Sequence, residues 1–280
     1  MSLFDSPAPR PVDGIRVGIG GWTFAPWRGV FYPSGLVQRR ELEYASRQLS
    51  AIEINGTYYG AQKPATYARW RDETPEAFVF SAKAPKRITG ARALARSGGA
   101  IDEFVGGIAE LGAKLGPIVW QFERGRTIEA SEFTAFVALL PKAAGGRPLR
   151  HVLDVRDPAF VNSELLALAR QHGVATVVTD SPDHPCFADL SADFVYARLM
   201  RSQPDIASGY AERDLAVWAE RARLWARGGE PDDLPRIEPR IEQRENAAGG
   251  PREVFIYFIS AAKERNPAAA VALLRKLGAC

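Results

Sequence analysis

Residues that could cross-link the chain or bind a metal are scarce. Two cysteines, Cys186 and Cys280, and three histidines occur among 280 residues. Neither cysteine lies in a CxxC or similar pair, so the sequence excludes a disulfide framework and a cysteine zinc site. A chain of this length buries about 70–75% of its unfolded surface and needs no such cross-link to hold a core.

Long apolar runs are also absent. No window approaches the roughly 18 apolar residues of a membrane span. Residues 1–14 contain three prolines and no apolar segment typical of a secretion signal. We therefore expect a reduced, cytoplasmic protein that does not interact with membranes.

The sequence has no large excess of charge of either sign, with 36 Lys plus Arg against 33 Asp plus Glu and a net charge of +3. This value is too small for a protein that coats nucleic acid, although the pI near 8.9 leaves room for a local basic patch. Lysine occurs at only seven positions, so each buried lysine is notable.

Eight apolar runs alternate with helical patterns along the chain. The expected strands cover 15–22, 50–59, 77–85, 117–122, 150–156, 174–180, 193–200 and 253–260. Helical spacing marks 38–49, 64–73, 100–116, 129–143, 160–173, the stretch around Leu215–Trp225, and 266–278. Apolar strands without alternation are typical of parallel sheets covered on both faces.

This order predicts a single (β/α)8 TIM-type barrel of eight parallel strands over residues 15–280, after a Pro-rich tail at 1–14. A doubly wound Rossmann-like sheet is the alternative. The Pro-, Gly- and charge-rich residues 228–252 are expected to form a long exposed insertion before strand eight.

Polar side chains occur late in otherwise apolar strands, where a barrel carries its functional groups. They are Glu53, Asn55, Ser81, Lys83, Gln121, Asp154, Arg156, Asp180, Tyr196, Arg198, Ser260 and Lys263. Buried and unpaired, each would cost several kcal/mol, so they must pair with one another or with a ligand. One interpretation is an internal salt-bridge network that closes the mouth. The other, which we favour, is a ligand site.

Lys83 has the greatest weight among single residues, because a lysine on an apolar strand can lose its proton easily. It suits a base or a Schiff-base amine, but a clamp for phosphate or carboxylate, or a partner for Glu53, is the simpler interpretation. We expect the clamp rather than covalent catalysis.

Other signals are weaker. The aromatic residues Trp22, Phe24, Trp27, Phe31, Tyr32, Tyr58 and Tyr59 can stack on sugars or bases, or pack as a lid. Gly18, Gly20 and Gly21 do not complete a dinucleotide fingerprint, because Thr23 occupies the position of the third glycine, three residues after Gly20. Asp180, Asp183 and His184 form a pattern more typical of a turn than of a metal site. No metal is predicted, and the cofactor is left open.

The motifs IRVGIGGWTFAPWRGVFYP, AIEINGTYY, FVFSAKAPKRIT, GPIVWQF, DVRDPAF, VTDSP and DFVYARL, within residues 15–260, resemble in order those of the YecE-like family, domain of unknown function 72. The resemblance implies a TIM-type barrel and says little about activity. It implies polar mouth residues at Trp22, Trp27, Glu53, Asn55, Tyr58, Lys83, Gln121, Arg156, Asp180 and Arg198.

The chain departs from that family pattern in three places. Asp157 and Met200 stand where the family usually has histidines, after strands five and seven. Ile259 and Ser260 stand where it usually has two asparagines. These changes remove groups for proton transfer and hydrogen bonding, so this member either performs different chemistry or keeps only a binding site.

We expect an enzyme or former enzyme that binds a small anionic ligand, phosphorylated or sugar-like, at a net cationic mouth. Glu53, Lys83 and Asp180 are the catalytic candidates, with Lys83, Arg156 and Arg198 as partners of the anion. The remaining ligand-binding candidates are Trp22, Trp27, Asn55, Tyr58, Gln121 and Asp154. The alternatives are a nucleic-acid-binding or processing protein that uses the aromatic and arginine-rich rim, and a catalytically inactive binding module.

Overall fold

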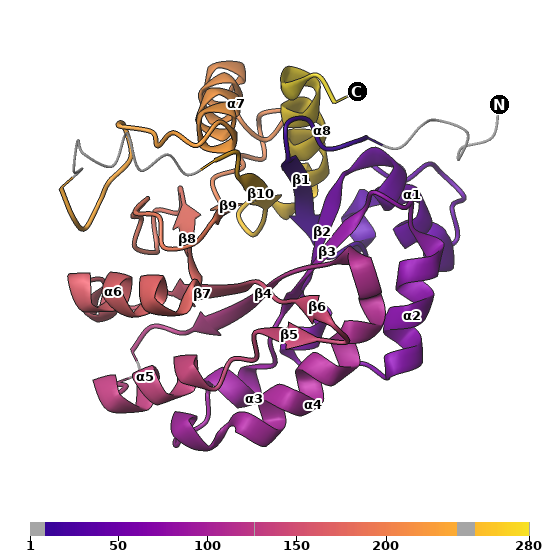
Figure 1. Cartoon of the computed structure of the whole chain (residues 1–280). Coiled ribbons are helices and arrows are strands. Elements are labelled where there is room, and N and C mark those ends of the chain that lie inside the picture. The colour runs from indigo at the N-terminus through magenta and orange to yellow at the C-terminus, as the bar shows by residue number, and fades with distance from the viewer. Residues whose placement is uncertain (1–8, 126, 240–249, 280) are drawn as a thin grey trace.

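The computed structural model describes residues 9–125, 127–239 and 250–279. Within them, parallel strands close into a barrel in the order β1, β10, β9, β8, β7, β4, β3, β2 (Figure 1). These strands are β1 Ile15–Gly20, β2 Ala51–Ile54, β3 Val79–Lys83, β4 Leu115–Phe122, β7 His151–Val155, β8 Ala175–Thr179, β9 Phe194–Leu199 and β10 Glu253–Phe258. The (β/α)8 barrel is confirmed. The doubly wound alternative is wrong, because β2 pairs with β1 and leaves no open edge.

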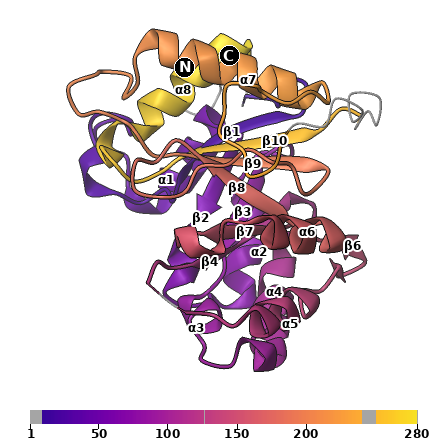
Figure 2. The ribbon, with the colours of Figure 1, turned by 90° about the vertical axis from the view of Figure 1, so that its left-hand side faces the viewer.

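Helices cover the outside of the barrel. They are α1 Glu41–Gln48, α2 Pro64–Glu73, α3 Lys86–Thr89, α4 Gly98–Ile108, α5 Ala130–Ala138, α6 Ser163–His172, α7 Glu212–Ala226 and α8 Asn266–Leu277. Figure 2 shows α7 and α8 on one side of the strands and α4, α5 and α6 on the other. None of the described helices is both long enough and apolar enough to cross a membrane.

The ends of α6 follow from local sequence. The Asn162 side chain accepts a hydrogen bond from the Leu165 amide at 2.9 Å, which satisfies a free amide of the first turn. Gly173 ends the helix at φ 63°, a conformation that other residues rarely adopt.

Two expected elements differ in the structure. The helix expected over 100–116 ends at Ile108, because Gly112 turns the chain with φ 58° inside a short 3-10 segment at Ala109–Lys114. Strand β4 then begins at Leu115 rather than 117. A small antiparallel pair, β5 Ala143–Ala144 and β6 Arg147–Pro148, was not predicted, because two-residue strands are too short to show a period.

Between β8 and β9 the chain forms no helix in residues 180–193. Part of residues 228–252, which were expected to form an exposed insertion, lies against residues 180–193 instead. Buried Asp189 accepts hydrogen bonds from the amides of Ile237 at 2.7 Å and Glu238 at 3.2 Å. Residues 228–239 are thus partly packed on the barrel, and residues 240–249 lie outside the described part of the chain.

Inward-facing side chains fill the barrel with a second, separate core. It consists of Ala51, Val79, Val119, Val152, Ala175, Val177, Phe194, Tyr196, Met200, Phe255, Tyr257 and Ile259. Gly18 makes room for these aromatic rings, because a Cβ there would lie 2.0 Å from the Ala51 carbonyl oxygen and 3.2 Å from the Tyr257 ring. The barrel is therefore a packed interior with its polar groups at one end.

We predict that Gly18→Ala destabilises the protein by about 3 kcal/mol or more, since the new methyl group meets the backbone of the paired strand β2. Gly106→Ala, in α4, is the control: its Cβ meets nothing within 4 Å, and a helical alanine should gain up to about 1 kcal/mol. Urea unfolding measures both. Equal stability of the two variants would contradict the close packing of β1 on β2.

Candidate functional site

The inner face of the barrel changes from apolar to polar toward the carboxyl ends of its strands. Apolar Ala51, Val119, Val152 and Tyr196 are each followed two residues later by a polar side chain: Glu53, Gln121, Asp154 and Arg198. Side chains two apart in a strand face the same way, so these four groups point into the mouth.

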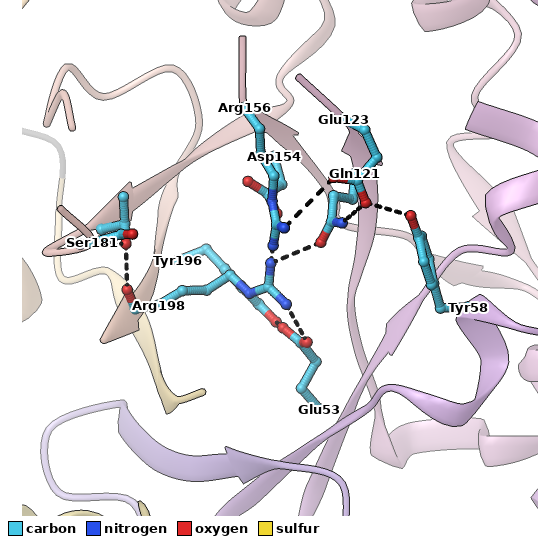
Figure 3. A network of polar contacts seen from close by, with 10 residues as sticks. Glu53, Tyr58, Gln121, Glu123, Asp154, Arg156, Ser181, Tyr196 and Arg198 are labelled. Carbon is cyan, nitrogen blue, oxygen red and sulfur yellow. Dashed lines mark hydrogen bonds and ion pairs between the residues drawn. The ribbon is translucent and has the colours of Figure 1, made fainter. Parts of the chain in front are cut away.

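Arg198 lies at the centre of the mouth and is only 1% exposed. Its Nη1 donates to Asp154 Oδ2 at 2.5 Å and to Gln121 Oε1 at 3.2 Å, and its Nη2 donates to Glu53 Oε1 at 2.7 Å (Figure 3). Burial disfavours its charge, but the attraction of Glu53 and Asp154 outweighs this and raises the pKa of Arg198. One buried cation thus connects β9 with β2, β4 and β7.

Phenol groups lie around and beneath this ion pair. Tyr196 donates its hydroxyl to Glu53 Oε2 at 2.6 Å, and the hydroxyls of Ser81 and Tyr257 are 2.7 Å apart. Burial raises the pKa of both tyrosines, so both are neutral. Because Arg198 and Tyr196 occupy its two oxygens, Glu53 is engaged in the ion-pair network rather than free.

A second set of contacts lies further out. Glu123 Oε1 accepts hydrogen bonds from the Tyr58 hydroxyl and from Gln121 Nε2, each at 2.5 Å (Figure 3). Arg156 Nε donates to Asp154 Oδ2 at 3.3 Å, while its Nη1 lies 3.7 Å from Glu123 Oε2. Burial acts to raise the pKa of Glu123, but the bond from Tyr58 and the charge of Arg156 lower it overall. Glu123 is therefore ionised at neutral pH.

Lys83 is the remaining cation of the mouth and is 8% exposed. Its Nζ lies 3.8 Å from the centroid of the Tyr58 ring, and within the described residues it forms no ion pair or hydrogen bond. Burial lowers the pKa of Lys83 to about 8, helped by the charge of Arg198 and opposed by Glu53. Glu53 pairs with Arg198, so Lys83 is not its ion-pair partner.

The charges of this cluster balance. Lys83, Arg156 and Arg198 face Glu53, Glu123 and Asp154, three of each sign. The expectation of a net cationic mouth is therefore wrong for these residues, because three carboxylates, among them the unpredicted Glu123, face the three cations. The interpretation of the polar residues as an internal salt-bridge network is correct for Arg198. It does not apply to Lys83, which has no carboxylate within ion-pair distance in the described chain.

The predicted aromatic residues of the first loop lie elsewhere. The Trp22 ring packs 4.8 Å from that of Trp70, in the layer between barrel and helices. Trp27 is 1% exposed and donates its Nε1 hydrogen bond to the Lys263 carbonyl at 2.9 Å. The structure brings neither residue to the Arg198 cluster. Asn55 lies over Gly20, where a Cβ would approach its Nδ2 to 2.5 Å.

Asp180 is also separate from the cluster. It accepts hydrogen bonds from the Met200 amide at 2.6 Å and the Tyr210 hydroxyl at 2.9 Å. Burial raises its pKa. It lines a cavity of about 870 Å³ at the ends of β8, β9 and β10, together with Ser260 and Trp218. Asp180 and Lys83 therefore occupy different parts of the carboxyl-terminal face.

The residues that depart from the family pattern have structural contacts of their own. Asp157 accepts hydrogen bonds from the amides of Ala159 at 3.0 Å and Gly125 at 2.8 Å. Met200 and Ile259 belong to the inner core. Ser260 adopts φ 59°, unusual for a residue other than glycine.

Sequence reasoning missed Glu123 and gave little weight to His184. Glu123 lies two residues after Gln121, so the period of two could have found it one step beyond the strand. Burial and the charge of Arg156 lower the pKa of His184, and its Nδ1 is buried without a partner among the described residues. Only the fold brings this loop residue close to Arg156.

Comparisons with known proteins agree with the geometry of the barrel. The family model described as "Protein of unknown function DUF72" matches residues 16–280. The UPF0759 protein YecE of Escherichia coli K12 is 28% identical over 172 residues, which cover 60% of this chain and 59% of YecE. The chain thus aligns with less than two thirds of that relative.

Solved structures share the fold at low sequence identity. A DUF72 family protein from Thermotoga maritima superposes with a TM-score of 0.66 at 17% identity, covering 94% of this chain and 98% of that one. A DUF72 family protein from Enterococcus faecalis gives 0.64 at 16% identity, with 94% and 97% covered. The structure named SacUVDE gives 0.56 at 13% identity, with 95% and 100% covered.

We predict that Arg198→Met lowers the free energy of unfolding by about 3–5 kcal/mol, because it leaves the buried carboxylate of Glu53 without a cation and removes the nearer of the two cations of Asp154. Adding Glu53→Gln and Asp154→Asn to the same chain should restore part of the loss. Arg213→Met, which removes an exposed pair with Asp214, should change nothing measurable. Denaturant unfolding gives the values. A triple variant less stable than Arg198→Met would refute this account.

Proposed function

The chain belongs to the DUF72 family of proteins of unknown function, and from this premise we propose that its barrel mouth binds a small anionic ligand and exchanges a proton with it through Lys83. The observation that carries the proposal is the state of Lys83: a buried ammonium beside arginines, with no carboxylate partner in the described chain. A bound anion would provide the missing partner.

The arginines divide the remaining roles. Arg198 is occupied by two carboxylates and holds the mouth together. Arg156 has a side chain that is 15% exposed, and within the described residues only its Nε makes a side-chain hydrogen bond. A guanidinium has five N–H donors, so Arg156 keeps donors for the oxygens of a ligand. Arg156 is therefore the second partner of the anion.

Proton exchange follows from the acidity of Lys83. General acid–base catalysis is most efficient when the pKa of the group lies near the working pH. With a pKa of about 8, Lys83 exists in both forms near neutral pH, unlike an ordinary lysine. This supports an enzyme rather than a pure binding module, and a cytoplasmic location stays a prediction from the sequence.

We predict that small carboxylates and inorganic phosphate bind the wild type and that the affinity for carboxylates, which stay ionised throughout, falls as the pH rises through about 8, where Lys83 loses its proton. Lys83→Met should weaken binding roughly tenfold, the value of one charge-assisted hydrogen bond, and abolish the pH dependence. Titration calorimetry between pH 6.5 and 9.5 measures both effects.

Lys86→Met is the matched control, because Lys86 is an exposed lysine three residues later in the chain, at the start of α3. It should bind like the wild type at every pH. Equal affinities for the Lys83→Met and wild-type proteins would remove Lys83 from the site. Binding without any turnover of candidate substrates would favour the inactive module.

A second candidate function, binding of single-stranded nucleic acid, has one specific observation in its favour. Tyr59 is 90% exposed and follows the mouth residue Tyr58, whose ring centroid lies 5.5 Å away. Large exposed aromatic rings at a polar rim are suited to stacking on bases, which contributes about 1–3 kcal/mol per base.

If this second function holds, Tyr59→Ala should weaken binding of a short single-stranded oligonucleotide by roughly tenfold at fixed salt. Affinity should also fall steeply with salt, because phosphate contacts release counterions. Fluorescence anisotropy measures both. Affinity that does not change with salt, or no binding at all, would exclude the nucleic-acid function.

A further inference from the structure

The surroundings of Lys83 differ from those of the other lysines that are removed from solvent. Lys114 Nζ donates to the carbonyls of Arg71 at 2.5 Å and Thr74 at 2.6 Å. Lys263 Nζ lies 4.5 Å from the Phe24 ring centroid in the packed first loop. Of these three lysines, only Lys83 lies on the inner face of the barrel, at the end of β3. A tyrosine ring lies on one side of it and the mouth on the other.

We propose that Lys83 is a nucleophilic amine, which condenses with the carbonyl carbon of a small oxo acid to form an imine. This inference rests on the proposed function, since the acid group of the substrate is the anion that Arg156 binds. It adds a substrate class, a carbonyl compound that also carries a carboxylate, and a covalent step.

The step balances without an oxidant or a reductant. The neutral Nζ forms a bond to the carbonyl carbon, and the π electron pair of the carbonyl moves to its oxygen, which takes up a proton. The resulting carbinolamine loses that oxygen as water, and the nitrogen, having released its protons, forms the C=N bond. Amine and carbonyl compound thus give imine and water.

The surroundings of Lys83 favour both the neutral amine that reacts and the protonated imine that forms. Arg198 and Arg156 lie close enough to lower the pKa of Lys83, so they disfavour the ammonium and favour the reactive amine. After condensation, a protonated imine would keep its charge over the Tyr58 ring, 3.8 Å from the present Nζ.

A carboxylate holds the tyrosine ring that lies over Lys83. Glu123 is ionised, 40% exposed, and holds the Tyr58 hydroxyl at 2.5 Å. We assign it the role of a positioning residue, which fixes Tyr58 against the amine.

The test is reductive trapping in the full-length protein. Pyruvate or glyoxylate is added with sodium cyanoborohydride near pH 7.5, and the protein is analysed by intact mass and peptide mapping. We expect an adduct at Lys83 that forms on the order of tenfold or more faster than at the exposed Lys86, because the neutral fraction of a lysine rises as its pKa falls. Propionaldehyde, which lacks the acid group, should react more slowly.

Lys83→Arg keeps the positive charge and removes the reactive amine, and circular dichroism verifies that it folds. It should form no adduct at residue 83, and Lys86→Met should be trapped at Lys83 at the wild-type rate. Binding of anions by the wild type without trapping at Lys83 would overturn the imine and leave the proposed function intact. Neither binding nor trapping would overturn both, and adducts spread equally over exposed lysines would also reject the imine.

Discussion

The buried charge of Arg198 is the constraint on which the mouth of this barrel depends. A guanidinium that is 1% exposed costs several kcal/mol unless its charge is balanced, and here Glu53 and Asp154 balance it from different strands. Those carboxylates can reach it only if β2, β7 and β9 hold their register around a closed barrel. The ion pair and the barrel closure therefore require each other. Tyr196 completes the arrangement by occupying the second oxygen of Glu53.

This use of Arg198 determines where chemistry can occur. The pair of carboxylates that neutralises it leaves nothing within ion-pair distance of Lys83 in the described chain, so Lys83 stays in an unfavourable charged state that a ligand can relieve. Arg156, held by one hydrogen bond to Asp154, lies at the same mouth with donors to spare. A cluster that is neutral as a whole thus still has a locally unbalanced cation. The net charge of the cluster does not show this imbalance, because it arises from which carboxylate pairs with which cation.

The sequence predicted the strands and the direction of their side chains better than the contacts between them. Apolar runs marked all the barrel strands, and the position of Glu53, Lys83, Asp154 and Arg198 late in those strands placed them at the mouth. It could not show that Arg198 takes both carboxylates, since that depends on the stagger of strands far apart in the sequence. Glycine and loop geometry account for other errors. The expected helix was too long, because Gly112 turns the chain within it. The aromatic first loop packs Trp22 and Trp27 inside the protein rather than directing them toward the mouth.

The departures from the family pattern acquire a physical meaning in this structure. Asp157 caps a turn and Met200 fills the barrel interior, so neither position that the resemblance assigns to a histidine carries an imidazole. A neutral imidazole nevertheless lies close to Arg156, because burial and the charge of that arginine lower the pKa of His184. It comes from the segment after β8, which takes the place of a helix between β8 and β9 and so passes near the mouth. Where the resemblance implies histidines at two strand ends, this chain has a loop histidine instead, whose pKa is lowered by burial and in part by the charge of Arg156.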